Sequence, residues 1–193
     1  MPKIDNHQFY SSAIKKYGVC AKGVNWNSAS TQNVRFKIIC KLLPQNIEQY
    51  QLLDAGCGFG DLYHYLQKTD KLPSSYEGID CHDDMVSIAS NNTGCCIYNL
   101  DIIKDSLPLA DYVICSGAMN TLSAYESFLF MKKCFEVSKK AFIFNILHGD
   151  KESQTYNYLS RKQIEEFANK LNVKKVTFVD GYLDADISVK FEK

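Results

Sequence analysis

Residues 52–61, LLDAGCGFGD, decide the fold. An apolar run leads directly into Gly56, Gly58 and Gly60, which recur at every second position and precede a segment with helical spacing. Glycine tolerates positive φ and lets the main chain approach a ligand closely, and the N-terminus of a helix presents N–H groups that have no intrahelical partner. A buried strand, a glycine-rich turn and a helix in this order predict a site for a nucleotide-like molecule.

The spacing of these glycines differs from the dinucleotide-binding pattern GxGxxG. Counting from Gly56, the sixth position holds Asp61 instead of glycine. Asp54 and Asp61 place negative charge on both sides of the turn, which repels a pyrophosphate and suits a ligand with an amino group or another positive charge. A nucleotide-dependent oxidoreductase is therefore a minor alternative, because it requires this displaced spacing to be tolerated.

Short apolar runs alternate with helix-period segments on both sides of the turn. We predict strands at 51–55, 76–80, 95–98, 111–115 and 141–146, each the kind of run that is buried on both faces of a parallel sheet. Strands separated by helices indicate an α/β fold. The tail, residues 173–193, holds two more strand-like runs around an Asp/Gly bend and predicts an antiparallel hairpin.

Helices are predicted between most of the strands. The helical segments are 5–16, 30–43, 61–68, 83–91, 125–138 and one that starts at Ser160. Ser160 and Gln163 have the spacing of a capping box. The interval 99–110 is short and contains Pro108, so a loop or a single turn is expected there.

Asp80 is the second chemical signal. It ends the run YEGID, twenty residues after Gly60. A carboxylate at the C-terminal edge of a strand accepts hydrogen bonds from both hydroxyls of a ribose, although Asp80 alone is equally compatible with a helix cap. Combined with the glycine turn, it predicts a nucleoside site.

The acid followed by three alternate glycines resembles the hallmark of class I S-adenosylmethionine-dependent methyltransferases. The resemblance covers residues 32–193 and continues in GIDCHDDM (78–85), NLDI (99–102), DYVICSGAMN (111–120) and AFIFNIL (141–147). It implies a Rossmann-like α/β sandwich with a seven-stranded, mostly parallel sheet that ends in an antiparallel C-terminal hairpin. It also implies S-adenosylmethionine as the cofactor and methyl transfer as the activity.

The resemblance assigns roles to matching positions. Gly56 and Gly58 would approach the methionine part of the cofactor, with Asp54 near its amino group and Asp80 on the ribose hydroxyls. Gly60 completes the glycine motif and is included among the cofactor-binding positions.

Further positions follow for the adenine. Cys81 and Met85 would enclose the ring, and Asp101 would accept a hydrogen bond from the adenine amino group beside the backbone of Ile102. The structural alternatives are a helix-core role for Met85 and a loop role for Asp101.

Ser116 and Gly117 would lie close to the sulfonium, the alternative for Ser116 being a hydroxyl satisfied by the backbone. The segments GVNWNSASTQNVRF, GDLYHYL and SGAMN resemble a bacterial group of methyltransferases for which no substrate is implied. Trp26 and Arg35 would close over the cofactor, with Arg35 pairing its carboxylate. The alternatives are equally plausible: Trp26 would anchor the chain by packing, and Arg35 would be a solvated residue on a helix.

The methyl acceptor is predicted to be a small molecule. The sequence SGAMN lacks the Asn/Asp-Pro-Pro-aromatic arrangement of amino methyltransferases that act on adenine or glutamine. Residues 1–30 are rich in aromatic side chains and are expected to form a lid over the core, residues 31–193. No catalytic residue is assigned, but His148 is a weak candidate for a base, and Asn120 and Tyr125 are weak candidates for orienting groups. A non-catalytic cofactor-binding protein is the other alternative.

The composition is that of one ordinary domain, residues 1–193. With 22 Lys and Arg against 22 Asp and Glu, the formal net charge is zero, which disfavours a nucleic-acid partner. No apolar run is long enough for a bilayer and no secretory pattern is present, so a cytoplasmic protein without a membrane partner is expected. The eight cysteines form no CxxC pair, which favours reduced structural thiols and no metal site. The oligomeric state is left open.

Overall fold

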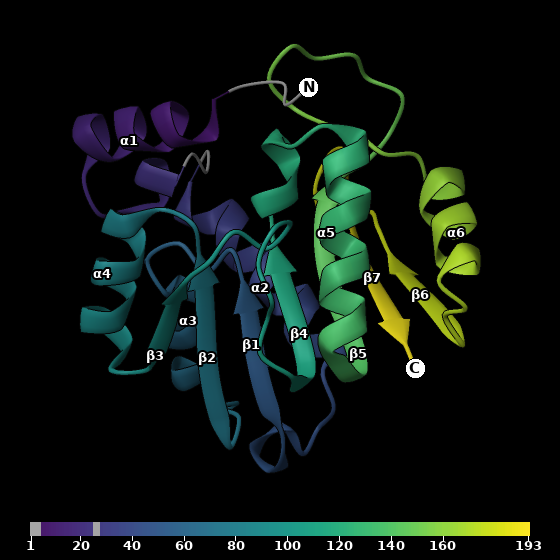
Figure 1. Cartoon of the computed structure of the whole chain (residues 1–193), viewed down its shortest axis with the longest axis horizontal. Helices are drawn as coiled ribbons and strands as arrows, with labels where there is room; N and C mark the ends of the chain where they lie inside the picture. Colours follow the sequence, from purple (N-terminus) through teal and green to yellow (C-terminus); the bar gives the residue numbers. More distant parts are fainter. Residues whose placement is uncertain (1–4, 25–27) are drawn as a thin grey trace.

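The computed structural model describes residues 5–24 and 28–193, and Trp26 lies outside this part of the chain. Its centre is a seven-stranded sheet with the order β3-β2-β1-β4-β5-β7-β6 (Figure 1). The strands are β1 (Gln51–Ala55), β2 (Ser75–Asp80), β3 (Cys96–Asn99), β4 (Ala110–Ser116), β5 (Ser138–Leu147), β6 (Lys175–Val179) and β7 (Asp186–Glu192).

The first five strands are mutually parallel, and β7 runs antiparallel to both β5 and β6. The register places Asp54 of β1 opposite Gly78 of β2 and Ile114 of β4. The seven-stranded, mostly parallel sheet with an antiparallel C-terminal hairpin is therefore confirmed. Because the parallel strands end at one edge, the polar residues that follow β1, β2 and β4 meet there.

Helices cover both faces of the sheet. The helices are α1 (Asn6–Tyr17), α2 (Ala29–Leu42), α3 (Asp61–Lys68), α4 (Asp83–Thr93), α5 (Ala124–Val137) and α6 (Arg161–Lys170), with short 3-10 turns η1 (Ala21–Val24), η2 (Ile47–Gln49) and η3 (Ala118–Thr121). Figure 1 shows α5 in front of the sheet and α2 and α3 behind it. As expected, no helix forms between β3 and β4.

Side-chain caps fix where several helices begin. The predicted capping box at α6 is present, since Ser160 and Gln163 bond each other's backbone N–H groups. A second, unpredicted capping box joins Ser123 and Glu126 at the start of α5. Asp5 caps α1 by accepting a hydrogen bond from the Gln8 N–H at 3.1 Å. These caps satisfy N–H groups that have no intrahelical partner.

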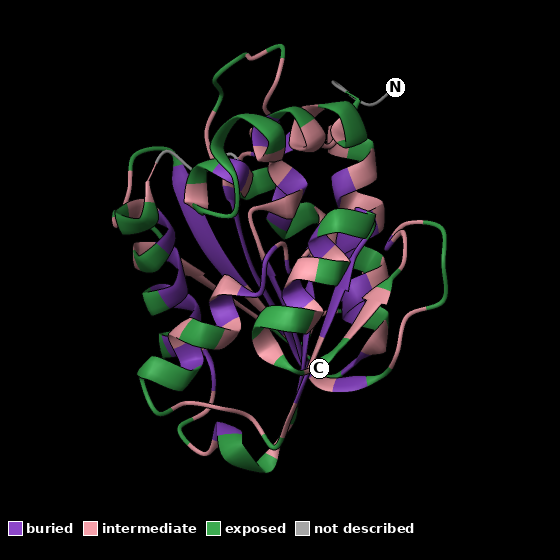
Figure 2. Ribbon diagram, turned by 90° about the vertical axis from the view of Figure 1, so that its left-hand side faces the viewer, coloured by how far each residue is buried: buried purple, intermediate pink, exposed green. Residues whose placement is uncertain are grey.

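The sheet separates two apolar cores. On one face, α2 and α3 pack on Leu52 and Ile114, and on the other face α5 and α6 pack on Leu53 and Val113. This alternation follows from the two-residue period of side chains along a strand. Figure 2 shows the strands as largely buried and the outer sides of the helices as exposed.

All eight cysteines are free thiols in the structure. Four of them are buried, Cys95 is half-buried, and Cys20, Cys81 and Cys96 are exposed, so the prediction of structural thiols fits half of the set. Within residues 5–24 and 28–193, no helix has the length and apolar character needed to cross a bilayer.

Candidate functional site

A cavity of about 1030 Å³ lies at the carboxyl ends of β1, β2 and β4. Its lining comes from the glycine turn, from the loops after β2, β3 and β4, and from α1, which lies across this edge of the sheet (Figure 1). Small-molecule sites typically occupy roughly 300–1,000 Å³. The cavity is therefore large enough for a nucleoside-sized ligand and a second small molecule.

The glycine turn brings the main chain to the cavity wall. Gly56 and Gly58 both line the cavity and have positive φ values of 78° and 55°. A Cβ on Gly56 would lie 2.4 Å from the Cβ of Ala118, so no larger residue fits there. The N–H groups of Gly56 and Cys57 donate to the Ile79 carbonyl at 2.8 and 2.9 Å, which ties the turn to β2.

Gly60 has a packing role in the fold. It does not belong to the cavity lining, although its φ of 84° also favours glycine. A Cβ at this position would lie 2.6 Å from Cγ2 of Thr93 in α4. Glycine therefore allows α4 to pack closely against the start of α3, and a role of Gly60 in cofactor binding stays a prediction.

Asp80 joins the two loops that form the nucleoside half of the cavity. Its Oδ2 accepts the Gly58 N–H and its Oδ1 accepts the His82 N–H, both at 3.0 Å. Burial raises the pKa of the Asp80 carboxyl, while the hydrogen bonds from Gly58 and His82 act in the opposite direction. Each carboxylate oxygen has a second lone pair, so the group has capacity for two more donors.

Asp54 lies at the end of β1 and also lines the cavity. It is buried, and it accepts a hydrogen bond from the Tyr76 hydroxyl at 2.6 Å. Burial raises the pKa of Asp54 to about 7, with the charges of Asp80 and Asp61 adding to the effect and the Tyr76 hydrogen bond opposing it. This carboxyl therefore changes its charge near neutral pH.

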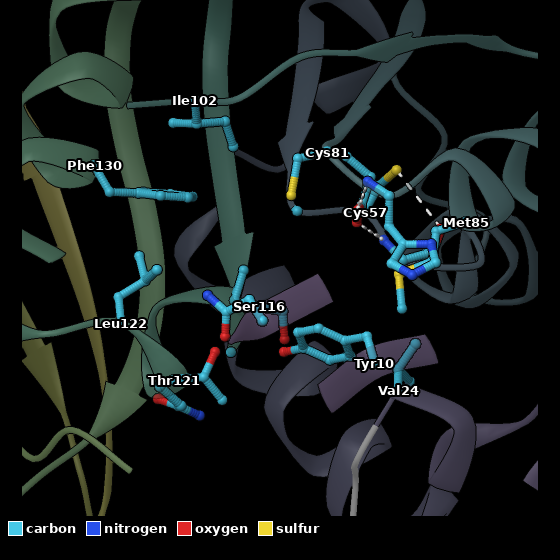
Figure 3. A pocket seen from close by; sticks show the side chains of 18 of the residues that line it. Tyr10, Val24, Cys57, Cys81, Met85, Ile102, Ser116, Thr121, Leu122 and Phe130 are labelled. Carbon is cyan, nitrogen blue, oxygen red and sulfur yellow. Dashed lines mark hydrogen bonds between the residues drawn. The ribbon is translucent and has the colours of Figure 1, made fainter. Parts of the chain in front are cut away.

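The residues predicted for the adenine all belong to the lining. Met85 is buried in the first turn of α4, and Cys81 lies in the loop before that helix (Figure 3). Ile102 is buried beside Asp101, whose Oδ1 accepts the Ile103 N–H at 3.0 Å. Burial acts to raise the pKa of Asp101, but the hydrogen bond and ion pair from Lys104 and the backbone donors lower it overall.

Ser116 ends β4, Gly117 follows it, and both residues line the cavity. Their predicted place beside the sulfonium stays a prediction. The Ser116 hydroxyl lies 3.5 and 3.4 Å from the side-chain oxygen and nitrogen of Asn145, a neighbour on β5. Gly117 has a φ of 81°, which glycine permits and which turns the chain into η3. Asn120 also lines the cavity, and its Oδ1 accepts the Leu147 N–H at 3.0 Å.

Three further predicted residues lie outside the cavity lining. The Arg35 guanidinium is buried and donates from Nε to Asp186 at 2.6 Å, so it is not a solvated arginine. The His148 ring lies with Nδ1 3.0 Å from the Leu159 carbonyl, and Tyr125 is 72% exposed on α5. The structure does not bring these three side chains to the cavity, and the roles assigned to them stay predictions.

Helix α1 brings residues to the site that were not assigned there. The rings of His7 and His82 are stacked with their centroids 4.7 Å apart, and the Ser11 hydroxyl lies 2.8 Å from His82 Nε2. Tyr10 extends into the cavity from the same helix (Figure 3). The aromatic content of the first residues was the only sequence signal, and it did not identify which face of α1 meets the sheet.

Three buried side-chain polar atoms have no hydrogen-bond partner within the described residues: Asn6 Oδ1, His82 Nδ1 and Thr121 Oγ1. All three residues line this cavity. An unsatisfied buried polar atom is costly, so such atoms normally have a partner. Their common location indicates that the cavity is built for a polar ligand.

No family model matches the sequence, and no curated protein matches it. Several solved structures are similar in fold. A Leishmania major S-adenosylmethionine-dependent methyltransferase has a TM-score of 0.70 at 17% identity, covering 96% of this chain and 83% of the other. Magnesium protoporphyrin IX methyltransferase from Synechocystis, with bound S-adenosylhomocysteine, has a TM-score of 0.68 at 13% identity, covering 85% and 83%. An Archaeoglobus fulgidus methyltransferase has a TM-score of 0.63 at 14% identity, covering 82% and 92%. The chain therefore has the Rossmann-like fold of class I S-adenosylmethionine-dependent methyltransferases.

Proposed function

We propose that this protein is an S-adenosylmethionine-dependent methyltransferase and that the cavity binds its cofactor. The observation that carries the proposal is the placement of Asp80. Its carboxylate lies at the end of β2, is held by N–H groups from the glycine turn and the α4 loop, and faces a cavity with further unpaired polar atoms. A carboxylate fixed in this way is suited to the two hydroxyls of a ribose.

The donor set around the cavity fits this cofactor. Gly56 and Gly58 allow close approach of the main chain on the methionine side, and Asp54 offers a carboxylate to an amino group. Cys81 and Met85 supply soft, apolar surface for the adenine. Among the described residues, no cluster of Lys or Arg side chains lines this half of the cavity. This lining agrees with a ligand of net positive charge, because no cluster of cations would repel it.

The bound cofactor would supply a methyl group on a positively charged sulfonium. The protein would then act mainly by aligning the acceptor with this methyl group and by excluding water from the reacting atoms. Asp80 and Asp54 would fix the two ends of the cofactor, and Ser116 and Gly117 would border the reacting end. Helix α1 would serve as the lid predicted for residues 1–30, because its residues Asn6, His7 and Tyr10 roof the cavity.

A small-molecule acceptor and a cytoplasmic location belong to the same proposal. The reacting end lies beneath α1 and beside η3, where a small molecule fits more readily than a folded nucleic acid, and the zero net charge supports this.

Thermal unfolding with S-adenosylhomocysteine tests the cofactor assignment. Ligand at 100 times its dissociation constant stabilises the fold by about 2.7 kcal/mol, which raises the Tm by roughly 5–10 °C for a domain of this size. NADH, titrated in parallel, should leave the Tm unchanged. A shift with NADH alone, or with neither ligand, would refute the proposal. Transfer of labelled methyl groups to an acceptor then separates an enzyme from a non-catalytic binding protein.

A further inference from the structure

Two of the three unpartnered buried atoms in the cavity are oxygens. Thr121 is 2% exposed at the end of η3, and Asn6 begins α1. Neither Thr121 Oγ1 nor Asn6 Oδ1 has a hydrogen-bond partner within the described residues, and both residues line the cavity. The Asn6 oxygen can only accept a hydrogen bond, whereas the Thr121 hydroxyl can accept or donate one, so a ligand with N–H groups can satisfy both.

Tyr10 joins these two oxygens to the reacting end of the cavity. Asn6 and Tyr10 are four residues apart on α1 and therefore lie on the same face. Figure 3 shows the Tyr10 ring extending toward Ser116 and Thr121, with Cys81 and Met85 at the opposite end of the view. Burial raises the pKa of Tyr10, and its interaction with the Thr121 side chain acts in the opposite direction. We call Asn6 Oδ1, Tyr10 Oη and Thr121 Oγ1 the oxygen trio.

The η3 turn that carries Thr121 is fixed from two sides. Asn120 Oδ1 accepts the Leu147 N–H at 3.0 Å, and the Asn120 carbonyl accepts the Asn157 N–H at 2.7 Å. Asn157 in turn donates from Nδ2 to the Ser127 hydroxyl at 3.0 Å. These contacts hold the turn in place, with the Thr121 hydroxyl at the cavity wall.

The charge of the lining restricts the ligand further. Among the described lining residues, the single Lys or Arg is Lys104, and its Nζ is paired with Asp101 at 2.8 Å. Seven carboxylates share the lining: Asp5, Asp54, Asp61, Asp80, Asp101, Asp105 and Glu126. Within the described lining, this field repels carboxylates and phosphates and has no unpaired Lys or Arg to stabilise a phenolate, whereas it attracts an ammonium group. The apolar wall of Ile102, Leu122 and Phe130 provides room for a hydrocarbon body (Figure 3).

We propose, on the basis of the function proposed above, that the methyl acceptor is an apolar amine whose N–H groups donate to members of the oxygen trio. An amine that enters as an ammonium ion would first lose one proton to solvent. The lone pair of the neutral amine would then form the N–C bond to the methyl group, while the C–S bond breaks and its electron pair remains on sulfur. The sulfonium becomes a neutral thioether, and the amine becomes a methylammonium ion with all its protons. Positive charge moves from sulfur to nitrogen, so oxygens beside the nitrogen stabilise the transition state more than the ground state.

Binding of small probes to the complex with S-adenosylhomocysteine tests this proposal. Calorimetry first measures the affinity for S-adenosylhomocysteine, and failure at this step would refute the cofactor assignment itself. Benzylamine, benzyl alcohol and benzoate are then compared at pH 8 by saturation-transfer NMR. Benzylamine should bind at least about tenfold more tightly than benzoate or benzyl alcohol, the size of effect expected when a buried polar group gains or loses its partner. Equal or stronger binding of either rival, or no binding of any probe, would overturn the amine assignment.

Substitutions in the oxygen trio test which residues bind benzylamine. Thr121→Val and Tyr10→Phe remove one hydroxyl each and should weaken benzylamine binding by about fivefold or more, with less than about a twofold change in affinity for S-adenosylhomocysteine. Tyr125→Phe removes an exposed hydroxyl from α5 and is the matched control, with no change expected in either affinity. Unchanged benzylamine binding in both cavity variants would overturn the proposal. An equal loss of S-adenosylhomocysteine affinity would also overturn it, since the trio would then belong to the cofactor site, but the proposed function would stand.

Discussion

Proton release on cofactor binding is the most direct measurement of the role of Asp54. Burial holds the pKa of this carboxyl at about 7 in the free protein, so it is protonated in about half of the molecules at pH 7. An ammonium group placed beside it would favour the carboxylate and lower the pKa. Binding of S-adenosylhomocysteine, which has this amino group, should therefore displace a proton from Asp54.

The size of the effect follows from the titration curve. About 0.9 proton per ligand should be released at pH 6, about 0.5 at pH 7 and about 0.1 at pH 8, if the bound carboxyl is fully ionised. Isothermal titration calorimetry in buffers of different ionisation enthalpy gives this number directly, because the observed enthalpy changes in proportion to the protons that the buffer takes up.

Asp54→Asn is the matched variant, since it keeps the shape of the side chain and removes its titration. It should bind S-adenosylhomocysteine more weakly at pH 8 and show no proton release from this position at any pH. If the binding enthalpy of the unaltered protein at pH 7 is the same in all buffers, Asp54 does not meet the amino group. Equal proton release in the variant would assign the proton to another group, such as Asp80, whose pKa burial also raises.

Three further predictions concern other residues. Asp80→Ala should weaken S-adenosylhomocysteine binding at least about tenfold by calorimetry, because charge-assisted hydrogen bonds contribute roughly 1.5–3 kcal/mol each; equal affinities would remove Asp80 from the site. Arg35→Met should lower the free energy of unfolding in urea by roughly 3–5 kcal/mol, since it leaves Asp186 buried without its cation, and the folded fraction should keep its affinity for S-adenosylhomocysteine. Gly60→Ala should destabilise the protein more than Gly94→Ala in the same urea assay, because both positions have positive φ but only the first meets a neighbouring side chain; equal losses would contradict the packing role.

The part of the site that the sequence predicts is the part made by strand ends. Asp54, Gly56 and Asp80 directly follow or end buried apolar runs, and parallel strands bring such positions to one edge of the sheet. Their location can thus be predicted from the local pattern of apolar residues and from the rule that parallel strands end at the same edge of a sheet. Gly60 belongs to the same motif, but its packing role depends on contact with α4. The motif shows that glycine is needed at this position. It does not show whether a ligand or a neighbouring helix creates the need.

Contacts between distant segments were not predictable in the same way. Arg35 and Asp186 are separated by 151 positions, and nothing in the local pattern around Arg35 identifies its partner. The amphipathic period of α2 indicates a buried face, yet a charged residue on that face can meet either a ligand or a carboxylate of the protein. Only the packing of α2 beside β7 decides between them.

The acceptor side of the cavity depends on such packing throughout. Asn6 and Tyr10 come from α1, and Thr121 comes from a turn held by residues 147 and 157. Helix α1, which meets the core through the His7–His82 stack and the hydrogen bond between Ser11 and His82, carries groups that would select the acceptor. The cofactor half rests on the strand ends of the sheet, and the selective half rests on α1 and η3. Acceptor specificity can therefore change by substitutions in α1 without loss of cofactor binding, because the two halves draw on different elements of the fold.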